Sequence, residues 1–127
     1  MKAVMRGHHD LIHDLQWSRN DDYLLTASAD CSVKIWDMIG FKDGSNESYG
    51  DRLNYTENDS RYFVCQLLHP SYVYGGGFFP DTSDERDSRL IIASVCYDQR
   101  VRLWLVTLDV EGKALQHDCL LELSIIE

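Results

Sequence analysis

The sequence lacks any long hydrophobic run. No apolar stretch approaches the ~20 residues that a membrane-spanning helix needs. The opening segment, MKAVMRGHHD, lacks the apolar core of a secretory signal peptide. We therefore expect a cytoplasmic protein that does not insert into a membrane.

Closely spaced cysteines are also missing. The four cysteines are Cys31, Cys65, Cys96 and Cys119. They include no CxxC pair, so a zinc ribbon is not expected. Such a scattered set favours free thiols in a reducing, intracellular compartment.

Positively charged residues are few. The chain has 12 Lys and Arg against 21 Asp and Glu, which gives a net charge of −9. Nonspecific nucleic-acid binding depends on cations that neutralise phosphates, so nucleic acid is disfavoured as a partner. An anionic membrane surface is disfavoured for the same reason. The 127 residues, 44 % of them hydrophobic, suffice for the packed core of one small domain.

What the sequence does contain is an internal repeat. Asp30 precedes Trp36 by six residues, and Asp98 precedes Trp104 by six. The intervening segments, CSVKI and QRVRL, both end in a small apolar residue, a cation and a larger aliphatic residue. Repeats of this kind indicate stacked copies of one structural unit.

The repeat extends upstream of each aspartate. A hydroxyl residue, Thr26 or Ser94, lies four positions before the Asp, and a histidine, His8 or His69, lies further upstream. Short apolar runs alternate with turn-forming segments in both units. This pattern is typical of antiparallel β structure.

Residues 7–37, GHHDLIHDLQWSRNDDYLLTASADCSVKIWD, resemble a WD40 repeat nearly throughout. The resemblance implies an all-β fold: a fragment of a WD40 β-propeller with about two four-stranded antiparallel blades and a long inserted loop. The second unit departs from the family pattern. Leu68 replaces the Gly before the His, Leu105 replaces the Asp after the Trp, and Gly76 occupies a normally apolar strand position.

The resemblance also implies a hydrogen-bonded network in each blade. The Trp N–H would contact the hydroxyl, the hydroxyl the His, and the His the Asp of the turn. A buried Trp N–H or His without a partner costs roughly 1–3 kcal/mol. The two expected structural sets are His8, Thr26, Asp30 and Trp36, and His69, Ser94, Asp98 and Trp104.

Three other chemistries deserve comparison with this network. A Ser-His-Asp hydrolase site would not occur twice at matching spacing, so we expect no enzyme and no catalytic residues. His8, His9 and His13 could suggest a metal site, but His8 belongs to the network and no suitable further ligand is near. Residues 75–77 are glycines without the Lys and Ser/Thr of a phosphate loop, and favour a bulge or close backbone approach. No metal or cofactor is expected.

The spacing of the repeats predicts an insertion. Asp30 and Asp98 lie 68 residues apart, whereas WD40 units repeat about every 40–45 residues. The excess falls in 40–62, a polar stretch expected to be a mobile loop, and in the acidic hairpin loop at 80–89. The expected segments are a first repeat at 1–39 with part of a preceding outer strand, the insertion at 40–62, and a second repeat plus following outer strand at 63–127.

Two blades would not close a propeller. Residues 63–68 and 119–126 are expected to form outer strands, and the opening KAVMR an outer strand of a preceding blade. A propeller needs about 4–8 blades, and an open array leaves exposed flanks. We therefore expect a fragment whose ring is closed by the remaining blades or by another copy.

By the same resemblance, partner contacts tend to lie three and five residues after the His and one residue before the turn Asp. The expected partner-binding residues are Leu11, His13 and Ala29 in the first unit, and Tyr72, Tyr74 and Tyr97 in the second. Tyrosine offers a large rigid surface with a polar tip, which suits an interface. The alternative is that some of these tyrosines only pack against the neighbouring blade.

A narrower pattern concerns LLHPSYVYGGGFFP and ASVCYDQRVRLWLV. Together with the first repeat, these segments resemble the jouberin family of ciliary transition-zone scaffolds. The resemblance implies a protein–protein interaction scaffold in cilium and basal-body assembly. The alternative is a WD40 adaptor such as a ubiquitin-ligase substrate receptor. Its frequent Trp-Asp-x-Arg motif is absent, because the two units read WDMI and WLVT.

Overall fold

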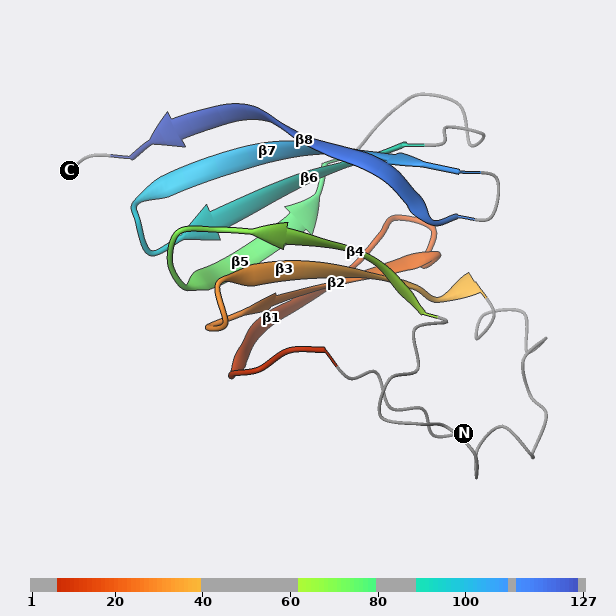
Figure 1. The fold of residues 1–127 in the computed structure, drawn as a ribbon, viewed down its shortest axis with the longest axis horizontal. Helices are drawn as coiled ribbons and strands as arrows, with labels where there is room; N and C mark the ends of the chain where they lie inside the picture. The colour runs from red at the N-terminus through yellow and green to blue at the C-terminus, as the bar shows by residue number, and fades with distance from the viewer. Residues whose placement is uncertain (1–6, 40–61, 80–88, 110–111, 126–127) are drawn as a thin grey trace.

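A computed structural model describes residues 7–39, 62–79, 89–109 and 112–125, which form eight strands (Figure 1). The strands are β1 (Ile12–Trp17), β2 (Tyr23–Ser28), β3 (Ser32–Asp37), β4 (Phe63–Leu68), β5 (Val73–Phe78), β6 (Arg89–Cys96), β7 (Arg100–Leu108) and β8 (Ala114–Ser124). Among the described residues, no helix is long and apolar enough to cross a membrane.

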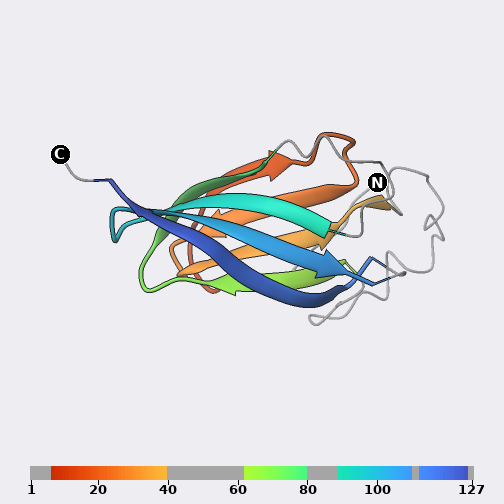
Figure 2. The ribbon, with the colours of Figure 1, turned by 90° about the horizontal axis from the view of Figure 1, so that it is seen from above.

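The strands form two antiparallel sheets of four, in the orders β1-β2-β3-β4 and β5-β6-β7-β8. The sheets lie face to face, and their strands run along the long axis of the molecule (Figures 1 and 2). This confirms the expected all-β fold of two four-stranded antiparallel units. β4 completes the first sheet although its residues open the second sequence repeat, so sheets and sequence repeats are staggered.

The last strand is longer than the sequence predicts. We expected it at 119–126, whereas β8 begins at Ala114. A tight turn precedes it, in which the Gly112 amide donates to the Asp109 carbonyl at 3.1 Å and Gly112 adopts a φ of 82°. Leu108 and Ala114 pair directly across this turn. The polar residues 116–118 interrupt the apolar pattern and hid the start of the strand.

Three expected segments fall largely outside the described residues: the opening KAVMR, the insertion up to residue 61, and the acidic loop at 80–88. Tyr62, at the end of the expected insertion, is described and buried. Its carbonyl accepts a hydrogen bond from the Asp37 amide at 2.7 Å. Tyr62 is therefore held beside Asp37, the last residue of β3.

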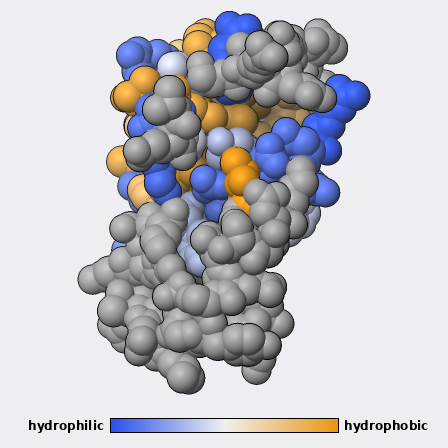
Figure 3. Space-filling model, turned by 90° about the vertical axis from the view of Figure 1, so that its right-hand side faces the viewer, coloured by the Kyte–Doolittle hydropathy of each residue, from blue (hydrophilic) through white to orange (hydrophobic). Residues whose placement is uncertain are grey.

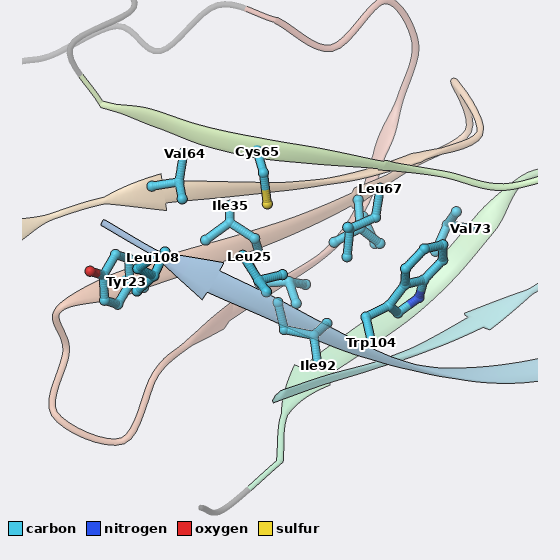
Figure 4. Packing of buried hydrophobic residues seen from close by; sticks show 13 residues of the cluster. Tyr23, Leu25, Ile35, Val64, Cys65, Leu67, Val73, Ile92, Trp104 and Leu108 are labelled. Carbon is cyan, nitrogen blue, oxygen red and sulfur yellow. The ribbon is translucent and has the colours of Figure 1, made fainter. Parts of the chain in front are cut away.

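The core lies between the two sheets (Figure 4). Leu25, Ile35 and Leu67 of the first sheet pack against Val73 and Ile92 of the second, and all five are fully buried. β5 makes most of the contacts between the sheets, against β1 and β2. Alternation along each strand places these side chains on one face, so burial of that face joins the two sheets.

The second sheet has an apolar face that is equivalent to the face of the first sheet packed in the core. Leu67 pairs with Val33 in the first sheet, and Leu123 pairs with Val101 in the second. These two pairs occupy equivalent positions, because Val101 follows Val33 by 68 residues. Leu67 is 0 % exposed between the sheets, whereas Leu123 is 53 % exposed. The second sheet thus carries an uncovered apolar face.

The glycines of β5 lie where the sheets approach each other. The pairing of β5 with β6 shifts between Val73 and Gly75, which is a bulge. A Cβ at Gly76 would lie 3.0 Å from the Ala93 carbonyl oxygen and 3.2 Å from the Leu25 side chain. The structure therefore confirms both interpretations of this segment, a bulge and a close backbone approach.

We expect Gly76→Ala to lower the free energy of unfolding by about 1–3 kcal/mol, because the new methyl group must displace the Ala93 carbonyl. Gly77→Ala is the matched control, since nothing lies within 4 Å of a Cβ there. The control should be neutral, or stabilising by up to about 1 kcal/mol through the unfolded chain. Urea unfolding measures both variants. Equal losses would contradict the steric explanation.

Candidate functional site

The first expected network is present with all four of its members. His8 Nδ1 lies 2.8 Å from Asp30 Oδ2, and His8 Nε2 lies 2.6 Å from Thr26 Oγ1. Trp36 Nε1 donates to the same Thr26 oxygen at 2.9 Å. A neutral His8 that carries its proton on Nδ1 can donate to Asp30 and accept the Thr26 hydroxyl proton. Every polar group in the chain of contacts is then satisfied.

The second network keeps two of these three contacts and replaces the third. Trp104 Nε1 donates to Ser94 Oγ at 3.0 Å, and Ser94 Oγ lies 2.7 Å from His69 Nε2. His69 Nδ1 lies 3.0 Å from the Leu67 carbonyl oxygen, to which it can donate. The backbone thus takes the place of the carboxylate.

The expectation that Asp98 contacts His69 is therefore corrected. Asp98 Oδ2 accepts from Arg102 Nη2 at 2.6 Å, and Oδ1 accepts from Nη1 at 3.3 Å. The Arg102 fork can bind both carboxylate oxygens. The equivalent cation of the first unit is Lys34, whose single ammonium group donates to Gln66. Asp98 is therefore paired with Arg102 instead of His69.

The first network has the connectivity of a hydroxyl–His–carboxylate triad, yet its surroundings favour a structural role. Thr26 is only 5 % exposed. Its oxygen already accepts the Trp36 N–H in addition to its contact with His8. A nucleophile has to reach its substrate, whereas this hydroxyl is buried and bonded to the indole N–H. The arrangement satisfies buried polar groups.

The three histidines weighed as metal ligands separate in the structure. His8 belongs to the first network, and the ring of His13 contacts Tyr74. The His9 backbone amide donates to Asp30 at 3.0 Å. Over 7–39, 62–79, 89–109 and 112–125, no three His, Cys, Asp or Glu side chains are grouped to hold a metal ion.

Burial and hydrogen bonds together set the protonation states in the two networks. Burial lowers the pKa of His8, against the opposing effect of Asp30, and it lowers the pKa of His69. Burial alone would raise the pKa of Asp30. Hydrogen bonds from Ser32, His8 and the His9 amide outweigh that effect and hold the pKa of Asp30 well below its usual range. A neutral imidazole beside an ionised carboxylate is thus the stable state near neutral pH.

We expect the free energy of unfolding to fall as the pH drops from about 7 to 5. The unfolded chain protonates its histidines near pH ~6.5, while the fold holds the pKa of His8 and of His69 below that value. The unfolded state then binds more protons, so acid favours it. Asp30, whose folded pKa is depressed, adds a further loss only below pH ~4. Urea midpoints at pH ~7.5 and ~5.5 measure the effect. His69→Gln should reduce it, and equal midpoints for the native protein would contradict it.

The expected partner-binding residues lie at one end of the sheets, with the β2–β3, β4–β5 and β6–β7 turns, at the left of Figure 1. The ring centroids are 6.1 Å apart for Tyr72 and Tyr97, 6.0 Å for Tyr97 and Tyr74, and 5.7 Å for Tyr74 and His13. We call these four residues the aromatic row. His13 belongs to the first sheet, so the row crosses between the two sheets.

The row is both packed and accessible. Tyr72, Tyr74 and Tyr97 contact neighbouring rings, yet they are 50 %, 48 % and 60 % exposed. The Tyr97 amide donates to the Tyr72 carbonyl at 2.8 Å. The Ala29 amide makes the equivalent bond to the Leu11 carbonyl at 2.8 Å in the first sheet. Leu11 is exposed and Ala29 is half-buried, at the same end of the sheets as the row. These backbone bonds fix the strand ends that carry the rings.

Sequence reasoning missed two contacts between the sheets. Asp14 Oδ2 accepts a hydrogen bond from the Gly76 amide at 3.3 Å. Lys113 Nζ donates to the Phe63 carbonyl at 3.1 Å. Each contact joins residues at least 50 positions apart, and nothing in a single sequence pairs them.

The family model described as "WD domain, G-beta repeat" matches residues 1–37. Residues 1–37 thus belong to the WD40-repeat family. Jouberin of Rattus norvegicus is 33 % identical to it over 100 residues, which is 79 % of this chain and 7 % of jouberin. Jouberin of Mus musculus is 32 % identical over the same shares. Nucleoporin SEH1 of Saccharomyces cerevisiae is 28 % identical over 104 residues, 82 % of this chain and 24 % of that protein.

These likenesses confirm the resemblance of the chain to jouberin at the level of its repeats. The chain spans only 7 % of the length of the jouberins that it matches. Its two sheets have the form of WD40 blades. One departure of the second blade, Leu68 in place of Gly, has a local explanation. A Cβ at Gly7 would lie 3.2 Å from the Trp36 ring, whereas Leu68, at the equivalent position, faces solvent.

Proposed function

We propose that this WD40 chain is a protein-interaction module that binds its partner through the aromatic row, with Leu11 and Ala29 beside it. One observation carries the proposal. Three half-exposed tyrosines and His13, contributed by both blades, form one continuous surface. Clustered aromatic side chains with polar tips are typical of the residues that dominate binding energy at protein interfaces.

We expect Tyr72→Ala combined with Tyr97→Ala to abolish capture of the partner while leaving the fold intact. The two substitutions remove exposed rings and leave the core untouched. Capture from extracts of ciliated cells, quantified by mass spectrometry, is compared with the native chain, and circular dichroism checks the fold. Undiminished capture by a folded double variant would contradict the proposal.

Phe79→Ala is the matched control for this experiment. Phe79 is 53 % exposed, like the tyrosines, but it lies just after β5, at the opposite end of the sheets. That end faces the viewer in Figure 3, where hydrophobic and hydrophilic side chains of the described residues are mixed. The control should capture as much partner as the native chain. Equal losses in both would point to a general effect of removing exposed rings.

We further propose that the module serves in assembly of the cilium and basal body, in the cytoplasm near the transition zone. The support is the similarity to the jouberins, together with the family resemblance of its repeats. A tagged full chain in a ciliated cell tests this proposal. Signal concentrated at the basal body is expected, and diffuse cytosolic signal without it would contradict the ciliary role.

The uncovered face of the second blade is proposed to bind further blades or another copy of the chain. Val95, Leu121 and Leu123 on this face are 42 %, 47 % and 53 % exposed. Their counterparts in the first blade are buried between the sheets, so the face is of the kind that packs on a neighbouring blade.

The isolated chain should therefore associate with itself, and Leu123→Glu should weaken this association because a charge opposes burial of the face. Sedimentation velocity over a range of concentrations measures both proteins. Ser124→Glu is a charge-matched control on the same strand, at an exposed position that pairs with Arg100 and alternates to the other face of the sheet. A native chain that remains monomeric and folded at high concentration would contradict the proposal.

A further inference from the structure

The aromatic row presents ring faces that no described Lys or Arg covers. The face of a tyrosine ring attracts a cation held within about 6 Å of its centroid. In the described part of the chain, the ammonium of Lys34 lies 5.5 Å from the centroid of the Phe63 ring in the first blade. No described Lys or Arg makes the same contact with Tyr72, Tyr74 or Tyr97. These faces are open to a cation from another molecule.

Carboxylates of the first blade lie next to the row. Asp14 directly follows His13, and its bond to the Gly76 amide holds it between β1 and β5, the strand of Tyr74. Asp10 lies exposed beside Leu11 and accepts that residue's amide at 2.7 Å. The groups around the rings therefore favour a positive ligand.

The nearby arginines do not cancel this preference, because their charges are already paired. Arg102 bonds to Asp98 and also donates from Nε to Glu122 at 2.9 Å. Arg100 Nη1 donates to Glu122 at 3.2 Å. The net charge of −9 on the whole chain adds a long-range attraction for cationic partners.

We propose that the aromatic row binds an arginine side chain of the protein partner. The inference rests on the proposed function and specifies the chemistry of its ligand. A planar guanidinium can stack on tyrosine faces while its edge donates to carboxylate or phenol oxygens. A lysine ammonium is more strongly hydrated and cannot stack in the same way.

The test is a titration of the full chain with the capped peptide acetyl-Gly-Ser-Arg-Ser-Gly-amide, followed by the NMR signals of the tyrosine rings. The comparison peptides replace arginine by citrulline, which has nearly the same shape without the charge, or by lysine. We expect the arginine peptide to shift the ring signals of Tyr72, Tyr74 and Tyr97. Each stacked ring contributes about two- to fivefold in affinity, so the citrulline peptide should bind at least about fivefold more weakly.

Two variants at one position separate ring stacking from simple apolar contact. Tyr97→Phe keeps a ring face and should retain the affinity for the arginine peptide. Tyr97→Leu keeps apolar area without the ring and should lose about two- to fivefold. Unchanged indole signals of Trp36 and Trp104 show that the fold is intact. Equal affinities of the two variants would contradict stacking.

The remaining outcomes distinguish this inference from the proposed function. Equal binding of the citrulline or lysine peptide, or no shift with any peptide, overturns the arginine site. Capture of a protein partner through Tyr72 and Tyr97 could still succeed in that case, by apolar or hydrogen-bonding contacts. Specific arginine binding without partner capture would support the arginine site and overturn the proposed function.

Discussion

Thr26→Val should lower the free energy of unfolding by about 2–4 kcal/mol. Valine has nearly the shape of threonine, so the core packing changes little. The lost hydroxyl leaves Trp36 Nε1 and His8 Nε2 without partners that lay at 2.9 Å and 2.6 Å. Each unsatisfied buried polar group costs about 1–3 kcal/mol. Urea unfolding at neutral pH, followed by tryptophan fluorescence, measures the loss.

Thr26→Ser is the matched control. Serine keeps the hydroxyl, and Ser94 makes the same two contacts in the second blade. The control should therefore cost much less than valine. If serine destabilised the chain as much as valine, the methyl group would be responsible, and the network would not have the structural role assigned to it.

Leu67→Ala should cost about 2–5 kcal/mol, the range for a leucine truncated in a packed core. Leu67 is 0 % exposed and lies between the two blades with Leu25 and Ile35. Truncation of this side chain leaves a cavity at the interface between the two blades. Chemical unfolding of the dilute chain measures the loss under conditions that limit self-association.

Leu123→Ala is the control supplied by the repeat itself. Leu123 occupies the equivalent position on β8 but lies on the uncovered face, so its truncation should change the stability of the dilute chain by no more than about 0.5 kcal/mol. A loss as large as that of Leu67→Ala would show that this face is packed in the isolated chain. That result would contradict the arrangement described here.

The fold could be predicted from the sequence because the patterns that indicate its strands and turns are local. Alternation of apolar residues and the spacing of Asp30 and Trp36 predict strands and turns, and the repeat of that spacing predicts a second sheet. The start of β8 was missed because residues 116–118 are polar on a largely exposed strand. Outer strands bury little, so their apolar pattern is weak.

The candidate site was harder to predict from the sequence, because its contacts depend on the geometry between residues far apart in the chain. Both units have a cation two residues before the Trp, Lys34 or Arg102, yet only the guanidinium captures its turn aspartate. The offsets from each His located the tyrosines. The contact of Tyr74 with His13 follows from the packing of two blades, which no local pattern specifies.

The most direct test is whether both blades build one aromatic surface in solution. A two-dimensional NOE spectrum of the full chain measures this without a partner. Cross-peaks between the ring protons of His13 and Tyr74, and between those of Tyr97 and both other tyrosines, are the expected result. Cross-peaks among the tyrosines alone, with His13 isolated, would show that the blades do not meet in this way and would contradict the binding surface proposed here.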